Sequence, residues 1–210
     1  MGNWNKGLYQ LGQRLGGTYL GSVGGNDTNS LLLLEHRGGV LAVHGYGNSG
    51  MMRGSMVTHT CVTQQVKLES PLQLFLAPKN LLEKWTQGKG ESQIEQKFRV
   101  ETNRKDAARW LLRSPALEKA LLACPKTEVT LYPVRWSALT QGIREADALK
   151  EGEGPGGAVV HMLRVHTTYI NEEWSWTDTA TTENIYAIDL VERMVELARV
   201  ICDTVLEYRL

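Results

Sequence analysis

Three glycines follow an apolar run early in the chain, and their spacing could serve phosphate binding. In the stretch VLAVHGYGNSG, Gly45, Gly47 and Gly50 stand in the order G-x-G-x-x-G. Where this motif binds a dinucleotide, the glycines let the backbone approach the pyrophosphate at the N-terminus of a following helix. Here the following residues, MMRGSMVTHTCV, end in an alternating, β-branched run that is typical of a strand. We therefore favour a strand that runs into an unanchored loop after Val43, with no helix to receive a phosphate.

The same stretch resembles the His-Gly turn that helps to form the oxyanion hole of α/β-hydrolases, with His44 and Gly45 in the matching positions. That fold also needs a nucleophile elbow, G-x-S-x-G, which occurs nowhere in the sequence. A site of this type is disfavoured, and we assign no catalytic residue. The alternative that stays open is a nucleotide- or small-molecule-binding enzyme that uses the Gly45–Gly50 loop and His44.

The histidines lack the spacing of a metal site. His161 and His166 lie on one predicted strand, where a separation of five puts them on opposite faces. His36 and His44 flank a predicted hairpin and could approach each other across it, together with His59 from the next strand. No acid or cysteine stands beside them at ligand spacing. The sequence therefore predicts solvated or singly hydrogen-bonded histidines, no metal and no cofactor.

Two tryptophans give the first candidate for a binding surface. Trp174 and Trp176 lie in the polar stretch EEWSWTDT, and in an extended segment they would point to the same side. Exposed aromatic side chains are enriched at binding surfaces, although these two could instead fold back over the edge of a sheet. We take this predicted loop as the first candidate surface and the Gly45–Gly50 loop as the second.

Composition and charge exclude several classes of protein. The 210 residues suffice for one core or two small packed lobes, and 42% of them are apolar. Lysine plus arginine and aspartate plus glutamate number 23 each, so general nucleic-acid binding is disfavoured. No secretory signal or transmembrane run is evident. Three widely spaced cysteines, Cys61, Cys124 and Cys202, are typical of reduced thiols in a cytoplasmic protein.

The pattern of elements predicts an α+β fold with antiparallel sheets rather than a steady alternation of strands and helices. We expect a helix at the N-terminus and a hairpin around the Gly38-Gly39 pair. Asn103 is a plausible N-cap of a helix, and Ser114 could cap a second helix that begins at Pro115. The other predicted strands cover residues 17–23, 56–69, 72–78, 97–102, 127–133, 134–140 and 158–170.

The last 28 residues or so predict a long amphipathic helix that packs across a sheet. One apolar stripe consists of Ile188, Val191, Val195, Ala198, Cys202 and Val205. The same stripe could pair between copies in a homo-oligomer. A charged, glycine-containing stretch near residue 90 divides the chain into 1–90, a helix plus antiparallel meander, and 91–210, a lobe with the order β-α-α-β-β-β-α. We expect the two lobes to pack as one unit.

The layout resembles that of a broad group of bacterial proteins of unknown function. The matching segments are RLGGTYLG, where a helix leads into a meander, FRVETNRKDAARWLLRSPALEKALL and the final LVERMVELARVI. The resemblance implies an α+β fold and a bacterial origin, and it carries no active site to this chain. Many members of the group are tethered to membranes through a preceding apolar segment, which this sequence lacks.

Together these observations favour a cytoplasmic protein that acts by binding a protein partner or a small ligand rather than by catalysis. The candidate binding residues are Trp174, Trp176, His44, Gly45, Gly47 and Gly50.

Overall fold

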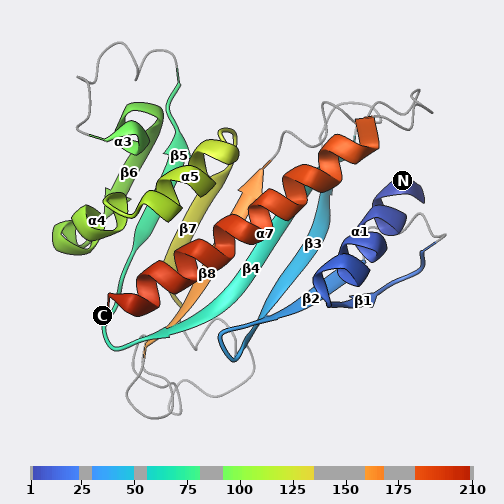
Figure 1. Ribbon diagram of the computed structural model, residues 1–210, viewed down its shortest axis with the longest axis horizontal. Coiled ribbons are helices and arrows are strands. Elements are labelled where there is room, and N and C mark those ends of the chain that lie inside the picture. The colour runs from blue at the N-terminus through green and yellow to red at the C-terminus, as the bar shows by residue number, and fades with distance from the viewer. Residues whose placement is uncertain are drawn as a thin grey trace.

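The computed structural model describes residues 2–23, 30–49, 56–80, 92–134, 159–167 and 183–208 (Figure 1). The helices of this part are α1 Gly2–Leu15, α3 Gln93–Lys97, α4 Lys105–Leu112, α5 Pro115–Ala123 and α7 Glu183–Glu207. Its strands are β1 Thr18–Leu20, β2 Leu31–His36, β3 Gly39–Ser49, β4 Met56–Leu68, β5 Leu74–Pro78, β6 Phe98–Thr102, β7 Glu128–Pro133 and β8 Val159–Thr167. The predicted strand at 134–140 lies almost wholly outside the described residues.

One antiparallel sheet contains all eight of these strands, in the order β1-β2-β3-β4-β8-β7-β5-β6. The predicted α+β fold with an N-terminal meander and a long C-terminal helix is thus confirmed. Strands β4 and β8 are neighbours although they come from opposite sides of residue 90. The ranges 1–90 and 91–210 therefore contribute to a single sheet.

The predicted hairpin is present between β2 and β3. Its two turn residues are Arg37 and Gly38, one position before the Gly38-Gly39 pair. Arg37 and Gly38 both have positive φ, 51° and 71°, whereas Gly39 is already the first residue of β3. Two consecutive positive φ angles are typical of a type I′ turn, whose twist matches that of the strands on either side. Gly38 accepts the left-handed conformation without cost from a side chain.

The helices cover one face of the sheet, which Figure 1 shows from the helix side. Because side chains alternate between faces along a strand, every second residue points to the helices. Val43, Val62, Val165 and Val129 form one such row across four strands, and all four are fully buried. The opposite side carries no helix among the described residues. We call it the uncovered face.

Helix α7 runs diagonally across the sheet, with α1 on one side of it and α5 on the other (Figure 1). The predicted stripe is confirmed from position 191 onward, and Ile188 is partly buried. Its fully buried members are Val191, Val195, Ala198, Cys202 and Val205. The stripe therefore packs inside the chain, against its own sheet and its neighbouring helices.

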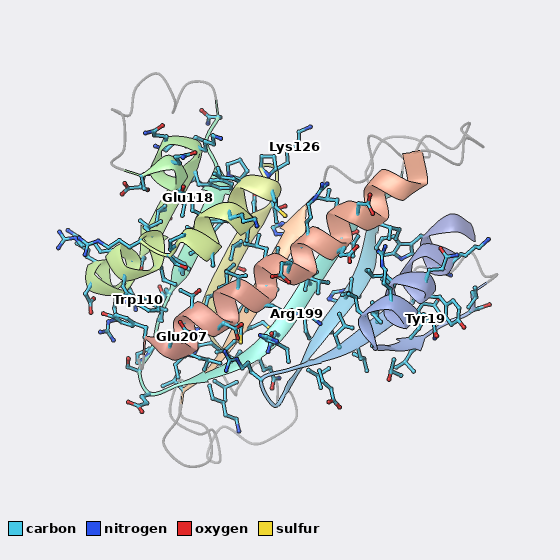
Figure 2. The ribbon with its side chains drawn as sticks, in the orientation of Figure 1. Tyr19, Trp110, Glu118, Lys126, Arg199 and Glu207 are labelled. Carbon is cyan, nitrogen blue, oxygen red and sulfur yellow. The ribbon has the colours of Figure 1, made fainter. Side chains whose placement is uncertain are left out.

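Polar contacts fix the C-terminal part of α7. Asp203 accepts a hydrogen bond from Arg37 Nε at 2.7 Å, which joins the helix to the β2–β3 turn. Tyr208 donates to Asp106 on α4 at 2.9 Å, and its ring lies 5.0 Å from that of Trp110. Figure 2 shows Trp110 close to this end of the helix. These contacts are exposed, so they position α7 more than they stabilise it.

One predicted helix cap is confirmed and another is wrong. Ser114 accepts a hydrogen bond from Leu117 N at the start of α5, and α4 and α5 are separate helices as expected. Asn103 is not the N-cap of α4, because that position belongs to Arg104. The amide oxygen of Asn103 instead accepts a hydrogen bond from Gln73 N at 2.8 Å. Asn103 therefore links the end of β6 to the chain before β5.

We expect Gly38→Ala to lower the free energy of unfolding by about 1–2 kcal/mol, because an alanine at φ 71° is in the left-handed region. No atom lies within 4 Å of the added Cβ, so the loss reports the backbone alone. Gly39→Ala is the matched control, since its Cβ meets only ordinary contacts from 3.6 Å. Urea unfolding of the two variants measures the difference. Equal losses would contradict a type I′ turn at residues 37 and 38.

Candidate functional site

The predicted loop after Val43 is wrong, because β3 continues through Ser49. Gly45 pairs with Thr60 and Gly47 with Thr58, and the last pair joins Ser49 to Met56. Pairing with β4 satisfies the backbone of these residues, which offsets the low strand propensity of glycine. Gly50 lies outside the described residues. Two of the three predicted loop glycines are therefore strand residues.

The G-x-G-x-x-G motif lacks the surroundings that phosphate binding requires. The fingerprint needs a helix that follows the glycines and a parallel sheet. Residues 56–68 form a strand instead, and β3 and β4 are antiparallel. We expected that no helix follows the glycines to receive an anion. From residue 56 to residue 68 the chain is a strand, in agreement with that expectation.

The other predicted site residues have separate outcomes. Trp174 and Trp176 lie outside the described residues, so their role stays a prediction. His36 pairs with Gly39 and His44 with Leu31, which places the two histidines at opposite ends of the hairpin. The approach that we considered between them is therefore wrong.

His161 and His166 lie on opposite faces of β8, as predicted. His161 is fully buried on the helix side, where its Nε2 accepts a hydrogen bond from Leu72 N at 2.9 Å. Its Nδ1 lies 3.0 Å from the carbonyl oxygen of Val159 and can donate to it. Burial lowers the pKa of His161, which favours the neutral ring that these two bonds need. His161 is therefore a satisfied core residue and no candidate for a site.

The uncovered face brings several polar side chains together. The register places His44, Cys61, His166 and Glu128 in one row across β3, β4, β8 and β7. Directly paired residues of antiparallel strands share a face, so all four side chains project from the uncovered face. Arg164 stands in the adjacent row, and its Nε donates to Cys61 Sγ at 3.2 Å. We call these five residues the Arg164 cluster.

The charge of Arg164 acts on two other groups of the cluster. Burial raises the pKa of Cys61 although Arg164 opposes the shift. Burial, and then the positive charge of Arg164, lower the pKa of His44. The thiol and this imidazole are therefore neutral near pH 7, while the guanidinium keeps its charge. Glu128 Oε2 lies 3.6 Å from His166 Nε2, and the Glu128 side chain is 46% exposed.

The same row is too wide to hold one metal ion. Neighbouring strands lie about 4.8 Å apart, so four residues on four strands span roughly 14 Å. Among the described residues, no group of three or more His, Cys, Asp and Glu side chains is placed to hold a metal.

A groove opens beside the cluster, where β3 and β4 separate. Their pairing stops at Leu41 and Gln64, although β4 continues to Leu68. The opening has a volume of about 610 Å³, which lies in the range of small-ligand sites. Its walls include Arg37, Val40, Ala42, Thr63, Lys67, Met162, Cys202 and Leu206. A second hollow of about 400 Å³ lies near Phe75, Glu101 and Tyr132.

Sequence reasoning found only His44 of the five cluster residues as a site candidate. Alternation along the β4 and β8 segments gives the faces of Cys61, Arg164 and His166. It does not give their neighbours, because β4 and β8 are separated by about ninety residues and their pairing is long-range.

We expect Arg164→Gln to raise the pKa of His44 toward its ordinary value of 6.5, because a nearby positive charge is removed. Burial is the larger cause, so the pKa should remain below 6.5. An NMR titration of the His44 ring measures the shift, with Arg109→Gln, an exposed arginine of α4, as the control. A His44 pKa that Arg164→Gln leaves unchanged would contradict the electrostatic contact.

Comparison with known proteins adds no relative. No protein-family model matches the chain, and no curated protein or solved structure matches it either. The resemblance to bacterial proteins of unknown function therefore remains an expectation from the sequence. None of the described helices is long and apolar enough to cross a membrane.

Proposed function

We propose that this protein acts by binding rather than by catalysis, and that its ligand is a small anion held by the Arg164 cluster on the uncovered face. The observation that carries the proposal is the position of Arg164 in the middle of the sheet, beside Cys61 and close enough to His44 to lower its pKa. A guanidinium offers a planar set of donors that fits carboxylate and phosphate groups.

Apolar exposure on the same face supports a binding surface. Among the described residues, five large apolar side chains are exposed, and the uncovered face carries three of them: Leu20, Val40 and Tyr132. Val40 is 53% exposed and Tyr132 45%. A solvated sheet face is normally polar, so exposed apolar side chains on this face favour a surface that meets a ligand or partner.

The chemistry of Cys61 argues against covalent catalysis. Its side chain is buried, with 1% of the residue exposed, and burial raises the pKa of its thiol. Since the thiolate is the nucleophile, this environment disfavours attack on a substrate. Arg164 donates to the sulfur from one side, which fixes the thiol as part of the wall of the site.

Titration with benzoate and with inorganic phosphate tests the proposal. We expect saturable binding of at least one of these anions, which Arg164→Gln weakens at least tenfold because it removes the charge-assisted hydrogen bonds. Arg109→Gln is the matched control and should bind as the unaltered protein does. Isothermal titration calorimetry gives the affinities, and NMR shifts of the His44 and His166 rings locate the ligand. Binding that survives Arg164→Gln, or shifts confined to other histidines, would overturn the proposed site.

A second candidate function is catalysis with His44, because the register also places Cys61 between His44 and His166. Alkylation of the folded protein by iodoacetamide separates the two candidates. Cys124 and Cys202 serve as internal references, since burial raises the pKa of each to about 11. If the protein acts by binding, iodoacetamide should alkylate all three thiols slowly at pH 7.5. Rapid and selective loss of Cys61 would favour the enzyme.

A further inference from the structure

We infer that the ligand is an amphiphile, an apolar chain that ends in a carboxylate, and that the chain lies in the groove between β3 and β4. The inference rests on the proposed function, because it takes Arg164 as the partner of the carboxylate.

The groove is lined by residues next to Arg164 in the sheet. Thr63 of β4 pairs with Arg164 on one side and with Ala42 on the other, and both Thr63 and Ala42 line the groove. Met162, also in the lining, is two residues from Arg164 on the same face of β8. A carboxylate on Arg164 would therefore lie within one strand spacing of Thr63 in the groove lining.

Part of the groove wall is apolar and could contact an alkyl chain, beside polar residues such as Thr63, Gln64 and Gln65. Val40, Ala42 and Met162 border it on the uncovered face, and Cys202 and Leu206 of α7 contribute from the helix side. From Thr63 to Lys67 the groove follows five residues of β4, whose four steps give a length of about 13 Å. This length accommodates a medium-length alkyl chain, whose burial would add affinity in proportion to its area.

The charged side chains around the groove favour a ligand that carries a negative charge. Among the described residues of its lining, Arg37 and Lys67 are charged and none is an aspartate or glutamate. Asp203 already pairs with Arg37, so Lys67 keeps the groove positive at its far end. A cationic amphiphile would meet positive charge at both ends, whereas an anionic one is attracted.

A chain-length series tests the inference on the full chain. We expect calorimetry to give affinities that rise from acetate to hexanoate to decanoate, with at least a tenfold gain for the last step, at concentrations below micelle formation. Ala42→Trp fills the groove and should abolish this gain while leaving acetate or benzoate binding within twofold. Glu101→Trp, which lies on the same face at the second hollow, is the matched control and should keep the gain. Arg164→Gln should weaken the binding of every acid by a larger factor than Lys67→Gln does, because Lys67 lies at the far end of the groove from the carboxylate.

The outcomes separate the inference from the proposed function. Equal affinity for short and long acids would overturn the inference and leave anion binding at Arg164 intact. Binding of decyltrimethylammonium as tight as that of decanoate would overturn the charge selection. Decanoate binding that depends on Lys67 and not on Arg164 would overturn the placement of the carboxylate. If no anion binds at all, the proposed function itself fails. Circular dichroism of each variant confirms that it is folded before it is scored.

Discussion

The burial of one face of α7 against one face of the sheet is the constraint on which the molecule depends. Complete burial of a valine, leucine or isoleucine side chain stabilises a fold by about 1.5–3 kcal/mol. From Val191 to Val205 the apolar stripe of α7 is buried, and it meets strand residues such as Val62 and Val165 from the same side. Because alternation sends every second strand residue to the helices, the residues between them point to the uncovered face.

This division explains why the uncovered face can carry polar chemistry. Arg164 and His166 alternate with Leu163 and Val165 along β8, so the strand serves the core and the face at the same time. The separation of β3 from β4 beyond Leu41 adds a groove where the sheet would otherwise be flat. A rigid sheet thus holds the guanidinium and the groove in a fixed relation, as a binding site requires.

Local patterns predicted the fold better than the site. The Gly38 turn, the Ser114 cap and the stripe of α7 each depend on residues close in sequence, and each was predictable. The features that the sequence did not predict depend on pairing between strands that are distant in the sequence. Partner strand β4 keeps Gly45 and Gly47 extended against their propensity, and β8 brings Arg164 beside Cys61. The short helix α3 had a local signal, the capping box of Ser92 and Glu95, which was missed among charged residues.

A crystal structure of the protein with decanoate tests the central claim most directly. The account predicts the carboxylate within hydrogen-bond distance of the Arg164 guanidinium, about 2.8 Å, with the alkyl chain between Val40 and Met162. It also predicts that the helix side of the sheet keeps its packing. Decanoate bound on the helix side, or a carboxylate distant from Arg164, would contradict it.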